Sequence, residues 1–329
     1  MKVLYIGGTG EISYQCVLRS AEAGYVTTVF NRAKSDKPLP QGVEQIVGDI
    51  EDRAAYAALA DGGFDVVCQF LAYDPPTIQR DLEVFSRRCG QYVLISTTAA
   101  YKKPPDHCVI TEDVPLANPY WSYAQKKAAM ESLLLQAHRE GLMKVTIVRP
   151  SHTYDRKFPG SIVQGDDWAW RVLNDKPVIV HGDGTSLWTL TNSKDFAAGF
   201  VGLLGNEAAF GEAFHITRHL DAYTWNRIFT EIGLALGKEA KLVHVPAETL
   251  VRYNSGWVGQ LFGDKIYSTM FDNTKIRTVT GTGQAKVSLT DGMAAAARGV
   301  LKRMENYQPD RQLHSLLDRI ADEQSSLGD

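Results

Sequence analysis

The sequence predicts an α/β fold in which a doubly wound parallel sheet is joined to a smaller C-terminal lobe. The first observation is that an apolar strand at residues 1–6 runs directly into a glycine-rich turn and a helix. The second is that short apolar runs alternate with helical stretches as far as residue 150, which is typical of parallel sheets. Beyond that point the alternation weakens and aromatic residues become frequent, which predicts a second lobe.

The predicted elements follow one another in strand–helix–strand order. A helix at 14–23, which Gly24 ends, precedes a second strand at 25–30. Further strands are predicted at 44–47, 66–71, 92–95 and 144–148, with helices at 52–59, 79–89 and 122–140 between them. We therefore assign residues 1–150 to the sheet domain and 151–329 mainly to the second lobe, with helices at 195–204 and 225–236. Segments near 185–205 are expected to return to the first domain.

Composition and charge exclude several classes of protein. The chain has 44% hydrophobic and 22% charged residues and a formal net charge of −3, so we predict no nucleic-acid partner. Its four cysteines are far apart without a CxxC pair, which predicts reduced thiols and no metal site. We find no signal peptide and no apolar run of membrane-spanning length, so we expect a cytoplasmic protein without a membrane partner.

The glycine-rich turn Gly7-Gly8-Thr9-Gly10-Glu11-Ile12-Ser13 lies between the first strand and the first helix. Glycines let backbone N–H groups approach a pyrophosphate, and the helix adds its unpaired N–H groups and positive dipole end. Ser13 occupies the third small position, where it still permits close packing. The pattern predicts a dinucleotide cofactor with a nicotinamide or flavin; the alternative is a purely structural turn.

Tyr123 and Lys127 lie four residues apart at the start of the long predicted helix, and therefore on one helix face. An ammonium beside a phenol favours phenolate, so we expect the pKa of Tyr123 to be lowered toward neutrality. A hydroxyl from Ser96, Thr97 or Thr98 at the end of the preceding strand would hold the substrate oxygen. The set predicts a proton relay for an alcohol next to a nicotinamide; the alternative is an exposed helix turn.

Together these motifs resemble the extended short-chain dehydrogenase/reductase superfamily, specifically its NAD-dependent epimerase/dehydratase branch. The resemblance spans most of the chain and rests on the GGTGEIS turn, Gly48-Asp49, the STTAAY cluster, Tyr123 with Lys127, Arg149-Pro150, and Gly182-Asp183-Gly184-Thr185 ahead of Asp195. It implies a Rossmann domain and a homodimer. It also implies Tyr123 as acid/base, Lys127 as ribose ligand and Thr97 in the Ser/Thr position. Cofactor contacts are implied at Gly7, Gly10, Glu11, Ile12, Asn31, Arg32, Asp49, Ile50, Leu71, Ala72, Lys127 and Pro150.

Three departures from the family pattern bear on substrate and cofactor. The second strand ends in Asn31-Arg32 without an acidic residue for the ribose 2′-OH, which slightly favours NADP over NAD. Trp188 stands where members that act on nucleotide-sugars usually have a diphosphate-binding arginine, and His152 where an asparagine commonly contacts substrate. Thr97 is followed by Thr98 rather than by the acidic pair of 4,6-dehydratases, which disfavours dehydration. Thr98, His152 and Trp188 remain candidate substrate residues.

We therefore predict an NAD(P)-dependent enzyme that epimerises a sugar or nucleotide-sugar at a secondary alcohol through a keto intermediate. The alternative is an NADPH-dependent reductase of a sugar or other small carbonyl compound, because both reactions share the hydride step. A second alternative is a non-catalytic nucleotide sensor or RNA-associated relative, since the turn followed by Phe30-Asn31-Arg32 also resembles chloroplast stem-loop RNA-binding relatives.

Overall fold

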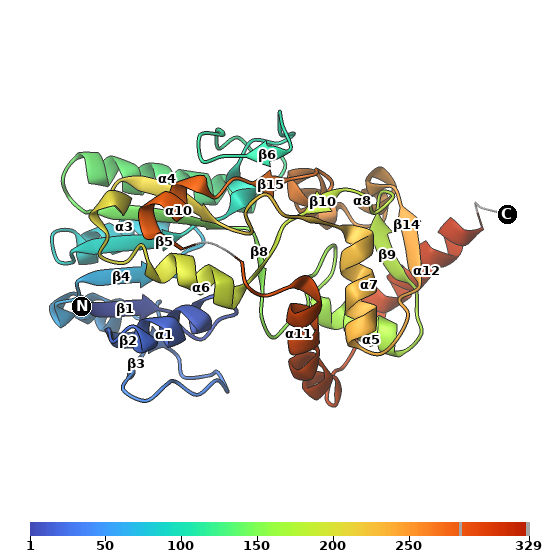
Figure 1. Cartoon of the computed structure of the whole chain (residues 1–329), viewed down its shortest axis with the longest axis horizontal. Coiled ribbons are helices and arrows are strands. Elements are labelled where there is room, and N and C mark those ends of the chain that lie inside the picture. The colour runs from blue at the N-terminus through green and yellow to red at the C-terminus, as the bar shows by residue number, and fades with distance from the viewer. Residues whose placement is uncertain (283–284, 327–329) are drawn as a thin grey trace.

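A seven-stranded parallel sheet forms the N-terminal part of the molecule (Figure 1). The computed structural model describes residues 1–282 and 285–326. The strands follow the order β12-β7-β5-β4-β1-β2-β3, and each pairs in parallel with its neighbour. Their bounds are β1 Lys2–Ile6, β2 Val26–Asn31, β3 Glu44–Val47, β4 Val66–Gln69, β5 Gln91–Ile95, β7 Val145–Pro150 and β12 Glu212–Ile216. This confirms the predicted parallel α/β sheet.

Helices cover both faces of the sheet because its strands alternate apolar side chains to the two sides. Val3 and Tyr5 face one core, whereas Leu4 and Ile6 face the other. The first core is closed by α1 (Ser13–Glu22), α6 (Ser193–Val201) and α10 (Thr274–Thr280), and the second by α2 (Arg53–Ala57), α3 (Pro75–Phe85) and α4 (Ser122–Arg139). Short 3₁₀ turns follow α2 (η1 Ala58–Gly62) and β5 (η2 Thr98–Ala100), and another, η3 (Glu207–Ala209), precedes β12.

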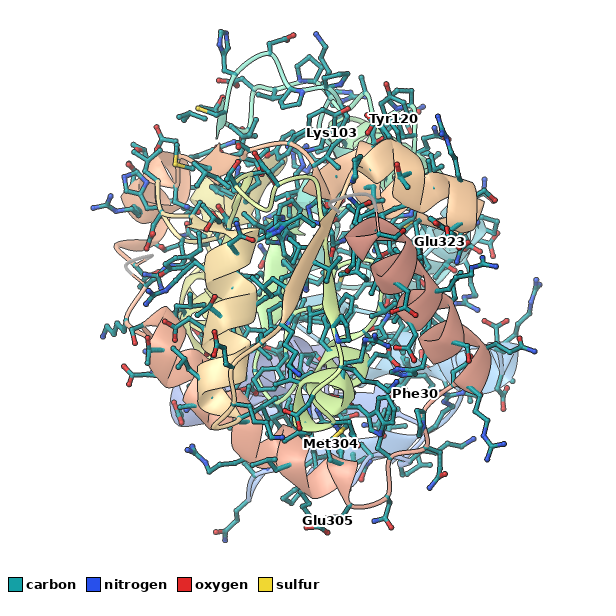
Figure 2. All side chains as sticks on the ribbon, turned by 90° about the vertical axis from the view of Figure 1, so that its right-hand side faces the viewer. Phe30, Lys103, Tyr120, Met304, Glu305 and Glu323 are labelled. Atoms are coloured by element: carbon teal, nitrogen blue, oxygen red, sulfur yellow. The ribbon has the colours of Figure 1, made fainter. Side chains whose placement is uncertain are left out.

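The second lobe lies beside the parallel sheet in Figure 1, and it has a core of its own that is built around Trp168, Trp225 and Phe229. Its strand pairs are β8 (His152–Tyr154) with β11 (Leu190–Asn192), β9 (Val178–His181) with β14 (Leu242–Val245), and β10 (Leu187–Trp188) with β13 (Tyr223–Thr224). Its helices are α5 (Gly165–Leu173), α7 (Trp225–Ala235), α8 (Ala247–Tyr253), α9 (Val258–Gln260), α11 (Leu289–Met304) and α12 (Arg311–Ser325), with the short turns η4 (Ser255–Trp257) and η5 (Leu261–Lys265). Figure 2 faces this lobe, with Met304 at the end of α11 and Glu323 on α12.

The chain crosses between the two parts several times after residue 150. α6, β12 and α10 lie on the parallel sheet, whereas β10 and β11, inside the segment expected to return there, pair with second-lobe strands. A further pair, β6 (Val109–Ile110) with β15 (Met270–Phe271), joins a loop of the first part to the second. Within the described ranges, no helix is long and apolar enough to cross a bilayer.

Candidate active site

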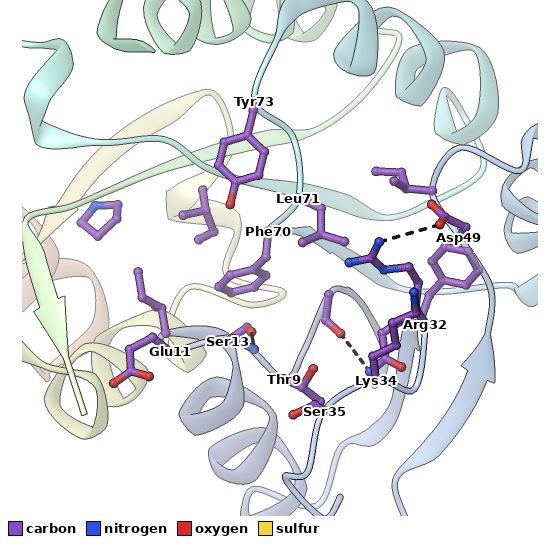
Figure 3. Close-up of a pocket in the computed structure, with 18 of the residues that line it drawn as sticks. Thr9, Glu11, Ser13, Arg32, Lys34, Ser35, Asp49, Phe70, Leu71 and Tyr73 are labelled. Atoms are coloured by element: carbon purple, nitrogen blue, oxygen red, sulfur yellow. Dashed lines mark hydrogen bonds and ion pairs between the residues drawn. The ribbon is translucent and has the colours of Figure 1, made fainter. Parts of the chain in front are cut away.

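A cavity of about 930 Å³ runs along the carboxyl ends of the central strands, where ligands of doubly wound sheets bind (Figure 3). Most of the residues predicted from the sequence line it, namely Gly7, Gly10, Glu11, Ile12, Asn31, Arg32, Asp49, Ile50, Leu71, Thr97, Tyr123, Lys127 and Pro150. Ala72, Thr98, His152 and Trp188 lie outside this lining. Most of the predicted cofactor-binding and catalytic residues therefore lie around one cavity, whereas Ala72 and the three candidate substrate residues do not line it.

The turn after β1 provides a cradle that side chains would fill. Gly7 and Gly8 have φ values of +113° and +88°, which L residues with a Cβ rarely adopt. A Cβ on Gly8 would lie 2.7 Å from the Val29 side chain, and one on Gly7 would lie 3.3 Å from Phe70 and Leu71. The bare backbone therefore fits the pyrophosphate of a dinucleotide, which requires close approach of main-chain N–H groups.

Three polar side chains hold this turn in place. The Ser13 hydroxyl accepts a hydrogen bond from the Gly10 N–H at 2.9 Å. Lys37, from the loop after β2, donates to the Gly10 carbonyl at 3.1 Å. The Glu11 carboxylate points away from the turn and accepts the backbone N–H groups of residues 155–157 in the second lobe, at 2.6 to 3.0 Å. Glu11 lines the cavity but is committed to this contact between the two parts of the chain.

The end of β2 shapes the opposite wall of the cavity. The Asn31 side chain is buried and accepts hydrogen bonds from the Ala33 N–H and from Gln45, both at 2.8 Å. Arg32 is exposed, and its guanidinium lies 4.0 Å from the Asp49 carboxylate (Figure 3). An exposed pair at this distance contributes little to stability, so Arg32 is free to meet a ligand.

Lys127 is buried beneath the cavity, with 3% of its surface exposed. Its Nζ donates to the carbonyls of Ala72 at 2.7 Å and Ile95 at 2.8 Å. Ala72 therefore serves the site through its main chain rather than by lining the cavity. Burial lowers the pKa of Lys127 to about 8, against the opposing charge of Glu131. An ammonium has three donors, so one remains for a ligand hydroxyl.

The Tyr123 hydroxyl lies beside Thr97 on the same cavity wall. Burial raises its pKa to about 12, and the nearby Thr97 side chain opposes this rise. The expectation that Lys127 lowers this pKa is wrong for the polypeptide alone. The Lys127 Nζ lies 5.8 Å from the centroid of the Tyr123 ring and is turned toward two carbonyls, so desolvation of the phenolate prevails.

The three hydroxyls considered at the end of β5 have different surroundings. Ser96 donates to Glu131, which also forms a buried ion pair with Arg149 at 2.6 Å. Thr98 is buried at the start of η2 and does not reach the cavity lining. Thr97 is left as the hydroxyl beside Tyr123. Glu131 was not predicted from the sequence, although its position four residues after Lys127 places both on one helix face.

Two further side chains near the site were not singled out from the sequence. Tyr73 points its ring into the cavity, 5.1 Å from the Lys127 Nζ (Figure 3). Lys265 is 7% exposed, and its Nζ lies 5.7 Å from the ring centroids of both Trp121 and Trp188. Neither residue belongs to a recognisable motif, and the burial of Lys265 depends on aromatic residues far away in sequence. Within the described residues, no group of three or more His, Cys, Asp or Glu side chains is placed to hold a metal ion.

Sequence comparison relates the chain to a known family. The model of the NAD dependent epimerase/dehydratase family matches residues 3–216. The chain is 26% identical over 259 residues to a 2'-dehydrokanamycin reductase of Streptomyces kanamyceticus, which covers 75% of this chain and 70% of that protein. It is 29% identical over 270 residues to the chloroplast stem-loop binding protein of 41 kDa b of Arabidopsis thaliana, which covers 77% of this chain and 66% of that protein.

Solved structures share the fold. UDP-glucose 4-epimerase from Bifidobacterium longum, in complex with NAD⁺ and UDP, superimposes with a TM-score of 0.75 at 17% identity, covering 93% of this chain and 100% of that one. At such low identity the likeness confirms the doubly wound architecture.

Proposed function

Because this chain belongs to the NAD dependent epimerase/dehydratase family, we propose that it epimerises a sugar or nucleotide-sugar at a secondary alcohol through a keto intermediate. It is an NAD(P)-dependent enzyme of the oxidoreductase type. One observation carries the proposal: the Tyr123 hydroxyl lies beside Thr97, next to the buried Lys127, in the same cavity as the glycine-rich turn. These are the groups that a hydride transfer at an alcohol carbon requires.

The chain's own residues move and hold the proton. The bound cofactor supplies the hydride acceptor and, when oxidised, a positive charge that favours phenolate. Tyr123 then accepts the hydroxyl proton of the substrate, and the Thr97 hydroxyl donates to the substrate oxygen. The free donor of Lys127 would hold a ribose hydroxyl of the cofactor. In an epimerase Tyr123 returns the proton after the keto intermediate has turned its other face to the cofactor.

Replacement of Tyr123 tests the proposal. Tyr123→Phe removes the acid/base and leaves the ring, so turnover of a nucleotide-sugar panel, followed as epimer formation by chromatography, should be abolished. Cofactor affinity should stay within a few-fold, because the phenol is not needed to hold the dinucleotide. Tyr120→Phe, an exposed tyrosine three residues away, is the matched control and should keep wild-type activity. Full activity in Tyr123→Phe would sink the assignment.

We propose a preference for NADP over NAD. Its support is the absence of an acidic side chain at the end of β2, where Asn31 is buried and Arg32, Lys34 and Ser35 line the cavity. A guanidinium binds a 2′-phosphate bidentately, whereas it offers nothing specific to a 2′-hydroxyl. Mass spectrometry of the small molecule released on denaturation, with competition between NAD⁺ and NADP⁺, tests this preference.

Reduction of a carbonyl compound is the second candidate, because one relative is named a 2'-dehydrokanamycin reductase. A reductase exchanges its cofactor at every turnover, whereas an epimerase regenerates it in place. Stoichiometric cofactor in the freshly purified protein therefore supports epimerisation. A protein purified empty that then binds added NADPH supports reduction. An RNA-associated role, suggested by the chloroplast relative, predicts salt-dependent RNA binding, which the net charge of −3 disfavours.

We also propose a homodimer, as the resemblance to the family implies. The apolar stripe of α4 does not carry this proposal, because Met130 and Leu134 are buried in the core beneath the sheet. Sedimentation equilibrium at micromolar concentration tests it, and a monomer there would remove it.

A further inference from the structure

Lys265 is a buried ammonium for which the described part of the chain provides no hydrogen-bond acceptor and no ion-pair partner. It is 7% exposed, and its Nζ lies 5.7 Å from the ring centroids of both Trp121 and Trp188. Cation–π contacts replace only part of the hydration that such a group loses. Its own burial accordingly lowers the pKa of Lys265. The Lys265 Nζ is not sealed from solvent, so an ammonium in a largely buried residue without a protein acceptor indicates a place that a ligand can reach.

The main chain of Lys265 is held by hydrogen bonds from the second lobe. The Lys265 carbonyl accepts hydrogen bonds from His181 Nε2 at 3.1 Å and from Trp225 Nε1 at 3.2 Å, both buried in the second lobe. Trp121 is accommodated by Gly259 and Gly263, on which a Cβ would lie 2.4 and 2.9 Å from it. The backbone of Lys265 and the Trp121 wall of the site are therefore both held in place by buried contacts.

His152 adds a second donor beside Lys265. The Trp188 indole N–H donates to His152 Nδ1 at 3.1 Å, so that nitrogen carries no proton. Burial, together with the charge of Lys265, lowers the pKa of His152 to about 3. The ring is therefore neutral with its proton on Nε2, and no described residue accepts it. Lys265 and His152 Nε2 both offer hydrogens, which suits an acceptor that brings only oxygens.

The charges around this place add up to one positive charge. Asp264 is the neighbouring carboxylate, and Lys103 pairs with it at 3.6 Å, so its charge is matched. Lys103 is itself buried. His152 is neutral, which leaves the Lys265 ammonium unbalanced. The arrangement fits one anionic oxygen group better than a neutral hydroxyl or a cationic amine.

This place adjoins the reacting centre. The Trp121 ring, which forms one wall of the Lys265 site, lies 5.1 Å from the Tyr123 ring, measured between centroids. His152 follows Pro150 and Ser151, which line the cofactor cavity. A substrate whose alcohol meets Tyr123 would therefore bring its neighbouring substituents to Lys265.

Resting on the function proposed above, we infer that the substrate carries an anionic oxygen group, a carboxylate or a phosphoryl, which Lys265 and His152 bind beside the reacting carbon. Trp188 occupies the position where related enzymes are expected to bind a diphosphate through arginine, and Lys265 supplies a positive charge from another segment. This selects acidic sugars over neutral sugars and amino sugars.

The test is direct binding to the protein loaded with NAD(P)⁺, measured by calorimetry with glucose, glucosamine, glucuronate and glucose 1-phosphate. Either acid should bind about ten- to hundredfold more tightly than glucose, since hydrogen bonds between charged groups are the strong ones. Tighter binding of glucuronate identifies a carboxylate, and tighter binding of glucose 1-phosphate a phosphoryl group. Equal affinity for the acids and glucose, or preference for glucosamine, would overturn the inference, and this comparison needs no variant.

Lys265→Met should remove the preference for the acids and leave cofactor affinity unchanged. Lys302→Met, at an exposed position on α11, is the control and should retain it. A preference that survives in Lys265→Met would contradict the inference even if the wild type binds acids well. Tyr123→Phe separates the two proposals: it should bind the acids like the wild type without turning them over. Turnover by Tyr123→Phe would refute the proposed catalysis while leaving the Lys265 site intact.

Discussion

Replacing the buried Lys127 should change how the stability of the protein depends on pH. Lys127→Met keeps the apolar stem and removes an ammonium whose pKa burial lowers from 10.5 to about 8. Between these two values the unfolded chain binds the proton and the folded chain does not, so wild-type stability gains as pH rises through this window. Below about pH 8 the buried charge destabilises the wild type by its full amount. At about 1.4 kcal/mol for each pH unit between the two pKa values, this amount is roughly 3 kcal/mol.

The magnitude follows from the same two values. Between about pH 7 and about pH 10, the wild type should gain about 2.5 kcal/mol over Lys127→Met. The variant also leaves the carbonyls of Ala72 and Ile95 without their donor, at roughly 1 to 3 kcal/mol each. This second cost does not depend on pH. The slope of the difference therefore reports the buried charge, whereas its offset reports the lost hydrogen bonds.

Urea unfolding of both proteins without added cofactor, at several pH values, measures the difference. Lys126→Met is the matched control, because Lys126 is the exposed neighbour on the same helix and its replacement should change the unfolding free energy by no more than about 0.5 kcal/mol. A difference for Lys127→Met that is flat with pH would refute the argument, since it would mean that burial does not disfavour the ammonium.

Two further predictions concern the frame of the site. Gly8→Ala should lower the free energy of unfolding in urea by about 1 to 3 kcal/mol, because the added Cβ meets the Val29 side chain. The same variant should weaken NAD(P)⁺ binding in calorimetry. Gly24 has a similar positive φ but open space around it, so Gly24→Ala should show only the smaller backbone strain. Equal losses in the two variants would argue against the close approach. Glu131→Gln should lower the free energy of unfolding by about 3 to 5 kcal/mol, because it leaves the Arg149 guanidinium buried without its ion-pair partner. Adding Arg149→Met should recover part of that loss. Additive losses in the double variant would contradict this account.

The sequence predicted the parallel sheet well because its signals are local. The strand, turn and helix of residues 1–23 each carry their own periodicity and punctuation, and the structure has β1 and α1 within a residue of the predicted bounds. The start of α3 was predicted four residues late at Gln79. The missed signal was Asp74, which caps the helix by accepting the Thr77 N–H, followed by proline in the first turn.

The candidate site was predictable only where a motif carries it. The cofactor cradle and the pair of Tyr123 and Lys127 follow from spacing along one strand or helix. Lys265 has no such signal, because a lysine next to Asp264 has the pattern of surface charge. Trp121 and Trp188, which bury it, come from segments distant in sequence. The pKa of Tyr123 was misjudged for a related reason: burial is a property of the whole fold, whereas the spacing to Lys127 is local.

The hydrogen bonds from the backbone N–H groups of residues 155–157 to the Glu11 carboxylate connect the glycine-rich turn to the second lobe. Three backbone N–H groups converge on one carboxylate oxygen, much as such groups converge on phosphate elsewhere in proteins. Any rotation of the lobe must lengthen these bonds or displace the glycine-rich turn. If the turn binds the cofactor as proposed, cofactor binding and the position of the second lobe are thermodynamically coupled, and each changes the other by the same free energy.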